Sequence, residues 1–240
     1  MERIRKISTG VEGLDRMLDG GLIAGRPYSV IGGPGSGKSI MGWQFLRQGV
    51  ANGENTMYIT LDEPHYEIRA NMDQIGLDDP SIRIMDLSPE DMFHEGEVSS
   101  LNFLERELPV QIEKLRPLRV VLDSTTSIRA LEKDEVNARR RILSLMKLLS
   151  ERGGADPSHP PITSLLLTED DGRAVPVESF LARGVIRLVN SIVRGSRVRA
   201  VLIEKMRGSP FDDHMRPLRI GQGGMRVADT DTLITSPEKV

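Results

Sequence analysis

A glycine-rich segment near the start of the chain has the residue types and the spacing of a phosphate-binding loop (P-loop). Gly32 to Ser39 reads Gly-Gly-Pro-Gly-Ser-Gly-Lys-Ser and satisfies G-x-x-x-x-G-K-[ST]. In such a loop the backbone N–H groups turn toward phosphate oxygens, Lys38 reaches the β and γ phosphates, and the Ser39 hydroxyl ligates Mg²⁺. The segment predicts a nucleotide site rather than a glycine-rich structural turn. The expected phosphate-binding residues are Gly32, Gly33, Pro34, Gly35, Ser36, Gly37, Lys38, Ser39 and Ile40.

A carboxylate at the end of an apolar run is the candidate partner of that metal ion. Arg119 to Asp123 reads Arg-Val-Val-Leu-Asp, a strand pattern that ends in an acid. A P-loop needs such a carboxylate on a second strand to hold the water shell of the metal. Apolar strands that end in Asp are common, so alone Asp123 could be only a turn residue. Together with the P-loop, Asp123 is predicted to support Mg²⁺ beside Ser39.

Two adjacent acids follow the next strand pattern along the chain. The run Met57 to Leu61 leads into Asp62, Glu63 and then Pro64. The carboxyl end of a strand in a parallel sheet is the edge where ligands bind, so one of these acids could polarise the water that attacks the γ phosphate. An acid beside a first-turn proline is also a favourable helix start. The residues alone leave both interpretations open.

Alternating strand and helix patterns surround these motifs. The predicted strands are Tyr28 to Ile31, Thr56 to Leu61, Ile82 to Leu87, Arg119 to Asp123 and Ile162 to Thr168. The predicted helices are Lys38 to Ala51, Tyr66 to Ile75, Leu101 to Leu115 and Asp134 to Glu151. This alternation predicts an α/β fold, with a mostly parallel sheet that helices cover on both faces.

The pattern changes after Phe180. Gly184 to Asn190 and Arg197 to Met206 are strand-like runs joined by a turn at residues 194–196, which predicts an antiparallel extension of the sheet. Short runs at residues 218–220 and 225–227 are candidate further strands of that extension. We expect one domain over residues 1–240, with a frayed tail at 229–240.

Composition narrows the class of protein. The chain has 240 residues, of which 38% are hydrophobic and 28% charged, which suits one α/β domain. No apolar run approaches the roughly 18 residues of a membrane span, and no apolar stretch of a signal peptide follows the charged start. We therefore expect a cytoplasmic protein without a membrane partner. The chain has no cysteine, and its four histidines have no i, i+4 pair, so a bound metal is expected to have oxygen ligands.

Charge is distributed unevenly along the chain. Arg183 to Arg226 contains 10 Lys and Arg against 3 Asp and Glu, a local charge of +7 in a chain whose net charge is −3. Three interpretations stay open: a nucleic-acid surface, a basic subunit face that meets an acidic one, or solvated strand residues.

The three motifs, in this order along the chain, resemble the KaiC branch of the RecA superfamily, whose core is shared by RadA and its paralogs. The opening Ile7 to Arg26 is similar to the family's opening segment, in which a short helix and a Gly-Gly turn lead into the P-loop strand. Near the other end, Glu204 to Ser209 resembles the family's Lys-x-Arg motif. The likeness extends over almost the whole chain and implies a RecA-like core.

The resemblance also implies a mechanism. ATP with Mg²⁺ would lie between neighbouring copies of a ring, a hexamer in this family, with Asp62 and Glu63 as the water-activating pair. Lys205 and Arg207 would reach from one copy to the phosphates bound by the next; the alternative is two solvated residues on one face of an edge strand. The ring would control its own assembly or a protein partner that the sequence does not identify.

Departures from the family pattern favour two alternatives. The family carries two Glu where this chain has Asp62 and Glu63, so we expect Glu63 to position the water and hydrolysis to be slow, or ATP to be sensed with negligible turnover. A recombinase-like, DNA-binding ATPase is disfavoured. The loops expected to meet DNA, at residues 152–161 and 169–178, carry few cations, and the second begins with three acids. Aromatic residues are only 4%, so stacking platforms for bases are scarce.

Overall fold

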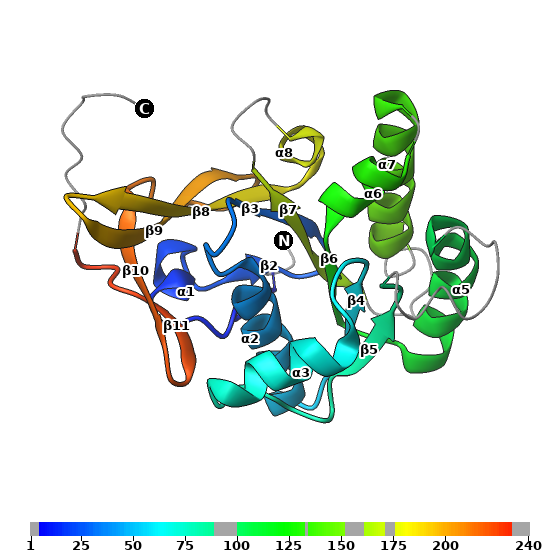
Figure 1. Ribbon diagram of the computed structural model, residues 1–240, viewed down its shortest axis with the longest axis horizontal. Helices are drawn as coiled ribbons and strands as arrows, with labels where there is room; N and C mark the ends of the chain where they lie inside the picture. Colours follow the sequence, from blue (N-terminus) through cyan, green and yellow to red (C-terminus); the bar gives the residue numbers. More distant parts are fainter. Residues whose placement is uncertain (1–4, 89–99, 133, 152–160, 171–175, 232–240) are drawn as a thin grey trace.

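The computed structural model describes residues 5–88, 100–132, 134–151, 161–170 and 176–231. Its centre is a nine-stranded sheet (Figure 1). In spatial order the strands are β11 (Gly224–Val227), β10 (Arg216–Gly221), β9 (Ser196–Met206), β8 (Gly184–Val193), β3 (Pro27–Gly32), β7 (Thr163–Glu169), β6 (Arg119–Asp123), β4 (Thr56–Thr60) and β5 (Arg83–Asp86). The strands predicted before residue 180 are all present, with ends that match or differ by one residue.

The sheet is parallel over most of its width. β8, β3, β7, β6, β4 and β5 run in one direction, and β9, β10 and β11 extend the sheet with antiparallel pairs. The predicted RecA-like α/β fold with an antiparallel C-terminal extension is therefore confirmed. The carboxyl ends of parallel strands lie on the same side of the sheet. The residues that follow β3, β7, β6 and β4 therefore lie close together there.

Helices cover both faces, as Figure 1 shows. One face carries α1 (Leu14–Met17), α2 (Lys38–Ala51) and α3 (His65–Gln74), and the other carries α5 (Ser100–Leu115), α6 (Thr125–Leu131), α7 (Glu135–Glu151) and α8 (Val177–Leu181). Side chains of β4 alternate between the two cores: Tyr58 packs on the α2 side, while Met57 and Ile59 pack on the α7 side. Both faces of the sheet are therefore buried.

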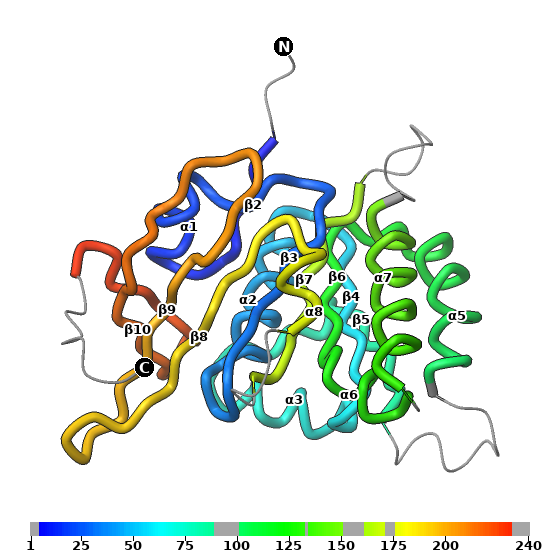
Figure 2. The backbone as a smooth tube through the Cα atoms, turned by 90° about the horizontal axis from the view of Figure 1, so that it is seen from above, coloured from blue at the N-terminus to red at the C-terminus, as the bar shows by residue number. Residues whose placement is uncertain are grey.

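The hairpin of β8 and β9 protrudes from the body of the molecule (Figure 2). The predicted turn at residues 194–196 is shorter in the structure: β8 continues to Val193 and β9 begins at Ser196. Arg194 and Gly195 both have positive φ, at 49° and 78°, which is the backbone of a tight two-residue hairpin turn. The opening segment adds a small antiparallel pair of β1 (Lys6–Ile7) and β2 (Leu22–Ile23).

Some predicted features lie outside the described residues. The two loops at residues 152–161 and 169–178 are described only at positions 161, 169–170 and 176–178, and the predicted tail only at 229–231. In the described part of that tail, Asp229 pairs with Arg16 of α1. No helix in the described ranges is long and apolar enough to cross a membrane.

Candidate nucleotide site

The P-loop connects β3 directly to α2. Gly37 precedes the first turn of α2 with φ 103°, in the left-handed region that glycine adopts without strain. A Cβ on Gly37 would lie 2.6 Å from Ile220 Cδ1 and 2.7 Å from Met225 Cε. A Cβ on Gly32 would lie 2.6 Å from the carbonyl oxygen of Leu188. Gly37 is therefore required by its backbone conformation, and Gly32 by the close approach of the Leu188 backbone.

Lys38 lies over the loop, and its side chain is buried. Its ammonium donates to the carbonyl oxygens of Gly32 at 2.9 Å and Gly33 at 3.3 Å. It also lies 3.5 Å from a carboxylate oxygen of Glu169, at the end of β7. The ammonium is thus held at the mouth of the loop, where a triphosphate could replace these oxygen partners.

Ser39 and Asp123 meet across the sheet edge. The Ser39 hydroxyl donates to Asp123 Oδ2 at 2.7 Å, and the Tyr58 hydroxyl donates to the same oxygen. Burial raises the pKa of the Asp123 carboxyl above its usual value, while these hydrogen bonds from Tyr58 and Ser39 act to lower it. Burial also raises the pKa of Tyr58 well above its usual value, so its hydroxyl stays a donor.

The two acids after β4 have different partners. Asp62 accepts hydrogen bonds from Ser124, at 2.9 Å, and from Ser127 of α6. Glu63 accepts one from Asn71 of α3, between Nδ2 and Oε1 at 2.6 Å. Asp62 is therefore bound to α6, and Glu63 to α3.

The environment of Glu63 favours its neutral form. Burial raises the pKa of the Glu63 carboxyl, the negative charges of Glu67 and Asp123 raise it further, and the hydrogen bond from Asn71 lowers it. A half-buried carboxylate with a raised pKa at the edge of a P-loop is suited to accept a proton.

These residues surround a single cavity of 430 Å³. The predicted residues that line it are Gly35, Gly37, Lys38, Ser39, Ile40, Asp62, Glu63 and Asp123. Gly32, Gly33, Pro34 and Ser36 form the rest of the loop, with Ser36 fully buried beneath it. The structure thus brings the predicted loop residues, Asp62, Glu63 and Asp123 to one place.

Several residues that line the cavity or contact the loop were not predicted, and three of them carry polar groups that face the loop. Arg199 of β9 lines the cavity and donates from Nε to the Gly35 carbonyl at 3.3 Å. Asn190 of β8 donates to the Pro34 carbonyl at 3.0 Å. Glu169, which faces Lys38, ends an apolar strand just as Asp123 does, so the same signal could have found it. Arg199 and Asn190 carry no such signal, because only the hairpin pairing places them here.

Lys205 and Arg207 lie on the opposite side of the sheet from the P-loop, where β3 and β8 begin. Lys205 pairs with Val185 at the start of β8, whereas the loop follows the far end of β3. The Lys205 ammonium donates to the carbonyl oxygens of Ser179 at 2.8 Å and Phe180 at 3.2 Å, at the end of α8. Burial lowers the pKa of Lys205, and the charges of Arg207 and Arg183 lower it further. Neither predicted cation therefore reaches the P-loop.

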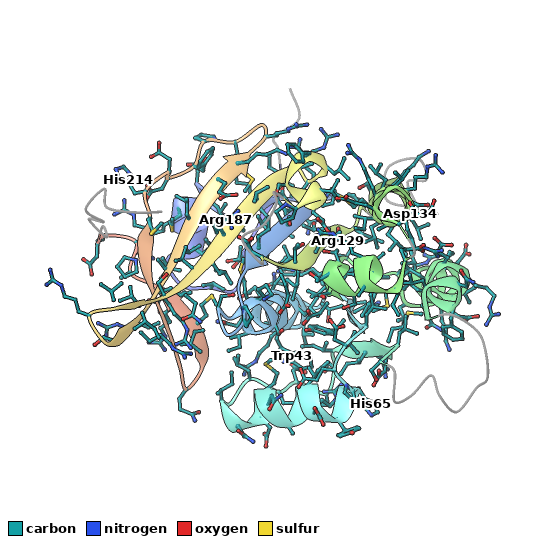
Figure 3. The ribbon with its side chains drawn as sticks, turned by 45° about the horizontal axis from the view of Figure 1, so that its top comes forward. Trp43, His65, Arg129, Asp134, Arg187 and His214 are labelled. Carbon is teal, nitrogen blue, oxygen red and sulfur yellow. The ribbon has the colours of Figure 1, made fainter. Side chains whose placement is uncertain are left out.

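Charged side chains of several elements are paired with one another. Arg187 of β8 bridges Asp170 and Glu204, and Arg129 of α6 bonds Glu178 of α8. Figure 3 shows Arg187 and Arg129 in the central part of the molecule, while His65 and His214 lie near its margins.

Several known proteins are similar to this chain over most of its length. A relative from Aeropyrum pernix, a UPF0273 protein, is 29% identical over 93% of this chain and 94% of its own length. The circadian clock oscillator protein KaiC of Prochlorococcus marinus subsp. pastoris is 30% identical over 94% of this chain, which spans 45% of that protein. The crystal structure of KaiC-like protein PH0186 from Pyrococcus horikoshii superposes with a TM-score of 0.75 at 28% identity, over 94% of this chain and 99% of that one.

The family described as "ATPase: KaiC" matches residues 7–232, which include the P-loop, both carboxylate motifs and the Lys-x-Arg segment. This match covers far more than the P-loop alone, which unrelated nucleotide-binding proteins also carry. The chain belongs to the KaiC ATPase family.

Proposed function

We propose that this chain is a single-domain, Mg²⁺-dependent ATPase that hydrolyses ATP between neighbouring copies of a ring, a hexamer, and that the ring regulates its own assembly or a protein partner. The observation that carries the proposal is the cavity at the sheet edge. It holds the Lys38 ammonium, the Ser39–Asp123 pair and the Glu63 carboxylate around one glycine loop.

The donor set fits Mg²⁺. The hydroxyl of Ser39 and the carboxylate of Asp123, whose oxygens lie 2.7 Å apart, are the hard oxygen ligands that this ion prefers. When bound, the ion would neutralise charge on the β and γ phosphates. The hydrogen bond from Tyr58 holds the Asp123 carboxylate in one orientation. In that orientation Asp123 would hold the water shell of the ion.

Glu63 is the proposed water-positioning residue. It is held by Asn71 and has a raised pKa, so it can accept the proton of the attacking water. Asp62 is shorter and both of its oxygens are engaged by Ser124 and Ser127. We assign Asp62 a supporting role, the orientation of α6 against the site.

Charge on the γ phosphate in the transition state would be stabilised from two sides. Lys38 acts within the copy that binds ATP. Lys205 and Arg207 would come from the neighbouring copy, because they lie at the opposite sheet edge of their own. An inserted arginine of this kind raises the rate of phosphoryl transfer by about 10³ to 10⁵.

Single-turnover ATP hydrolysis tests the proposed role of Glu63. Glu63→Gln keeps the size of the side chain and its bond with Asn71 but removes the base, so the rate should fall by about 10² to 10⁴ while ATP binding is retained. Asp62→Asn serves as the matched control and should lose less. Equal rates in wild type and Glu63→Gln would remove Glu63 from catalysis and favour a sensor that binds ATP with negligible turnover.

A further inference from the structure

A groove lined with cations lies where β3 begins, on the side of the sheet opposite the P-loop. It measures 960 Å³ and lies between α7, the start of β3, the end of α8 and the residues after β9. All of its charged lining residues are basic, and none of its lining residues in the described ranges is acidic. They are Arg26, Arg140, Lys147, Arg183 and Arg207, and we call this feature the cation groove.

The cation groove cannot serve the nucleotide of its own copy. Pro27 lines the groove, and Gly32, at the other end of the same strand, begins the P-loop. Five residue steps of extended strand separate them, a distance of roughly 16 Å. The phosphates of a nucleotide in the P-loop of the same copy therefore cannot reach the groove.

Backbone contacts hold two of the cations side by side. The Arg26 guanidinium donates to the Arg207 carbonyl at 2.8 Å, and the Arg207 N–H donates to the Arg183 carbonyl at 2.8 Å. Neither the Arg183 nor the Arg207 side chain makes an ion pair with any residue that the structure describes. Lys205 differs, because its ammonium is bound to the end of α8. Arg183 and Arg207 are thus two neighbouring groove cations whose guanidinium groups can meet an anion.

We propose that Arg183, together with Arg207, binds the phosphates of a nucleotide held in the P-loop of a second copy that docks on the cation groove. This rests on the proposed function and adds Arg183 to it. Arginine suits the role because its planar fork binds phosphate through two parallel hydrogen bonds.

The two surfaces are complementary. The P-loop cavity is lined by four acids, Asp62, Glu63, Asp123 and Glu169, against two cations, and a bound triphosphate adds more negative charge. The groove offers cations together with two exposed apolar side chains, Phe180 at 61% and Leu143 at 40% exposure. A basic surface with apolar residues fits a protein face that carries an anion, since apolar contacts and charge pairs then act together.

The test compares steady-state ATP hydrolysis of the wild type with that of Arg183→Ala, Arg183→Lys and Arg207→Ala. Arg139→Ala is the control, an exposed arginine on α7 that does not line the groove. Loss of a charge-assisted phosphate contact should lower kcat/KM of Arg183→Ala by about tenfold or more, chiefly through KM. Arg183→Lys should recover part of the loss, and Arg139→Ala should match wild type.

The outcomes separate this inference from the proposed function. If Arg207→Ala loses turnover while Arg183→Ala matches wild type, Arg183 is wrongly assigned and the site between copies stands. If both hydrolyse ATP as wild type does, the site between copies is wrong as well. If Arg183→Ala hydrolyses ATP normally but no longer binds a labelled single-stranded oligonucleotide that wild type binds, the groove takes a free polyanion, and the inference is overturned.

Discussion

At the residue scale, the site is built from pairs of polar groups that come from different elements. Ser39 of α2 meets Asp123 of β6, and Glu63 meets Asn71 of α3. The P-loop, Asp123 and the Asp62–Glu63 pair were predictable because each carries a local pattern of residue types. Asn71 was not, because its role depends on how α3 packs after the turn, and the sequence around it shows only a polar helical face.

The pH dependence of hydrolysis should report on Glu63. A base must be ionised, so the rate should fall as the pH drops through the raised pKa of Glu63. Asn71→Ala removes the hydrogen bond that lowers this pKa and should move the acid limb to higher pH. Glu67→Gln removes a charge that raises it and should move the limb to lower pH. Single-turnover rates across pH measure both shifts.

The control is thermal unfolding of each variant at the same pH values. It must show that the variant is folded at every pH at which its rate is measured. Shifts of the two acid limbs in the same direction would contradict the assignment of this limb to Glu63, as would no shift in either.

At the element scale, α6 and α8 connect the site to the opposite edge of the sheet. Ser127 of α6 bonds Asp62, Arg129 of α6 bonds Glu178 of α8, and Lys205 bonds the end of α8. Neither helix was predicted. They have only 7 and 5 residues, too few turns for a helical repeat of apolar positions to stand out. The long helices and the parallel strands were predicted because their apolar periods run over enough residues.

The Arg129–Glu178 pair should contribute measurably to stability. The Glu178 side chain is fully buried, and within the described residues its Oε1 has no hydrogen-bond partner. Arg129→Met would leave that carboxylate buried without its cation, so the free energy of unfolding should fall by about 3 kcal/mol. The double variant Arg129→Met/Glu178→Leu removes both charges and should be more stable than the single variant. Urea denaturation measures both, and a loss below about 1 kcal/mol in Arg129→Met would show that the pair is not needed.

At the scale of the whole molecule, the two ends of the central strands carry surfaces of opposite charge. One end holds the P-loop cavity with its acids, and the other holds the cation groove with Arg207. The sequence showed the basic excess of residues 183–226 but not its division between two places: Arg199 lies at the loop, whereas Arg183 and Arg207 lie at the groove. That division follows from the hairpin, which brings the start of β9 to one edge and its end to the other.

The most direct test of an ATPase site between copies is to mix two variants, Lys38→Ala and Arg207→Ala, each expected to be inactive alone. Mass by light scattering, with and without Mg·ATP, would establish whether wild type and variants assemble. Each hybrid interface that joins the intact loop of one variant to the intact groove of the other should be active. Random mixing in equal amounts gives about a quarter of the wild-type rate. A mixture that assembles and stays as inactive as its components, or an Arg207→Ala variant that alone hydrolyses ATP as wild type does, would contradict a site shared between copies.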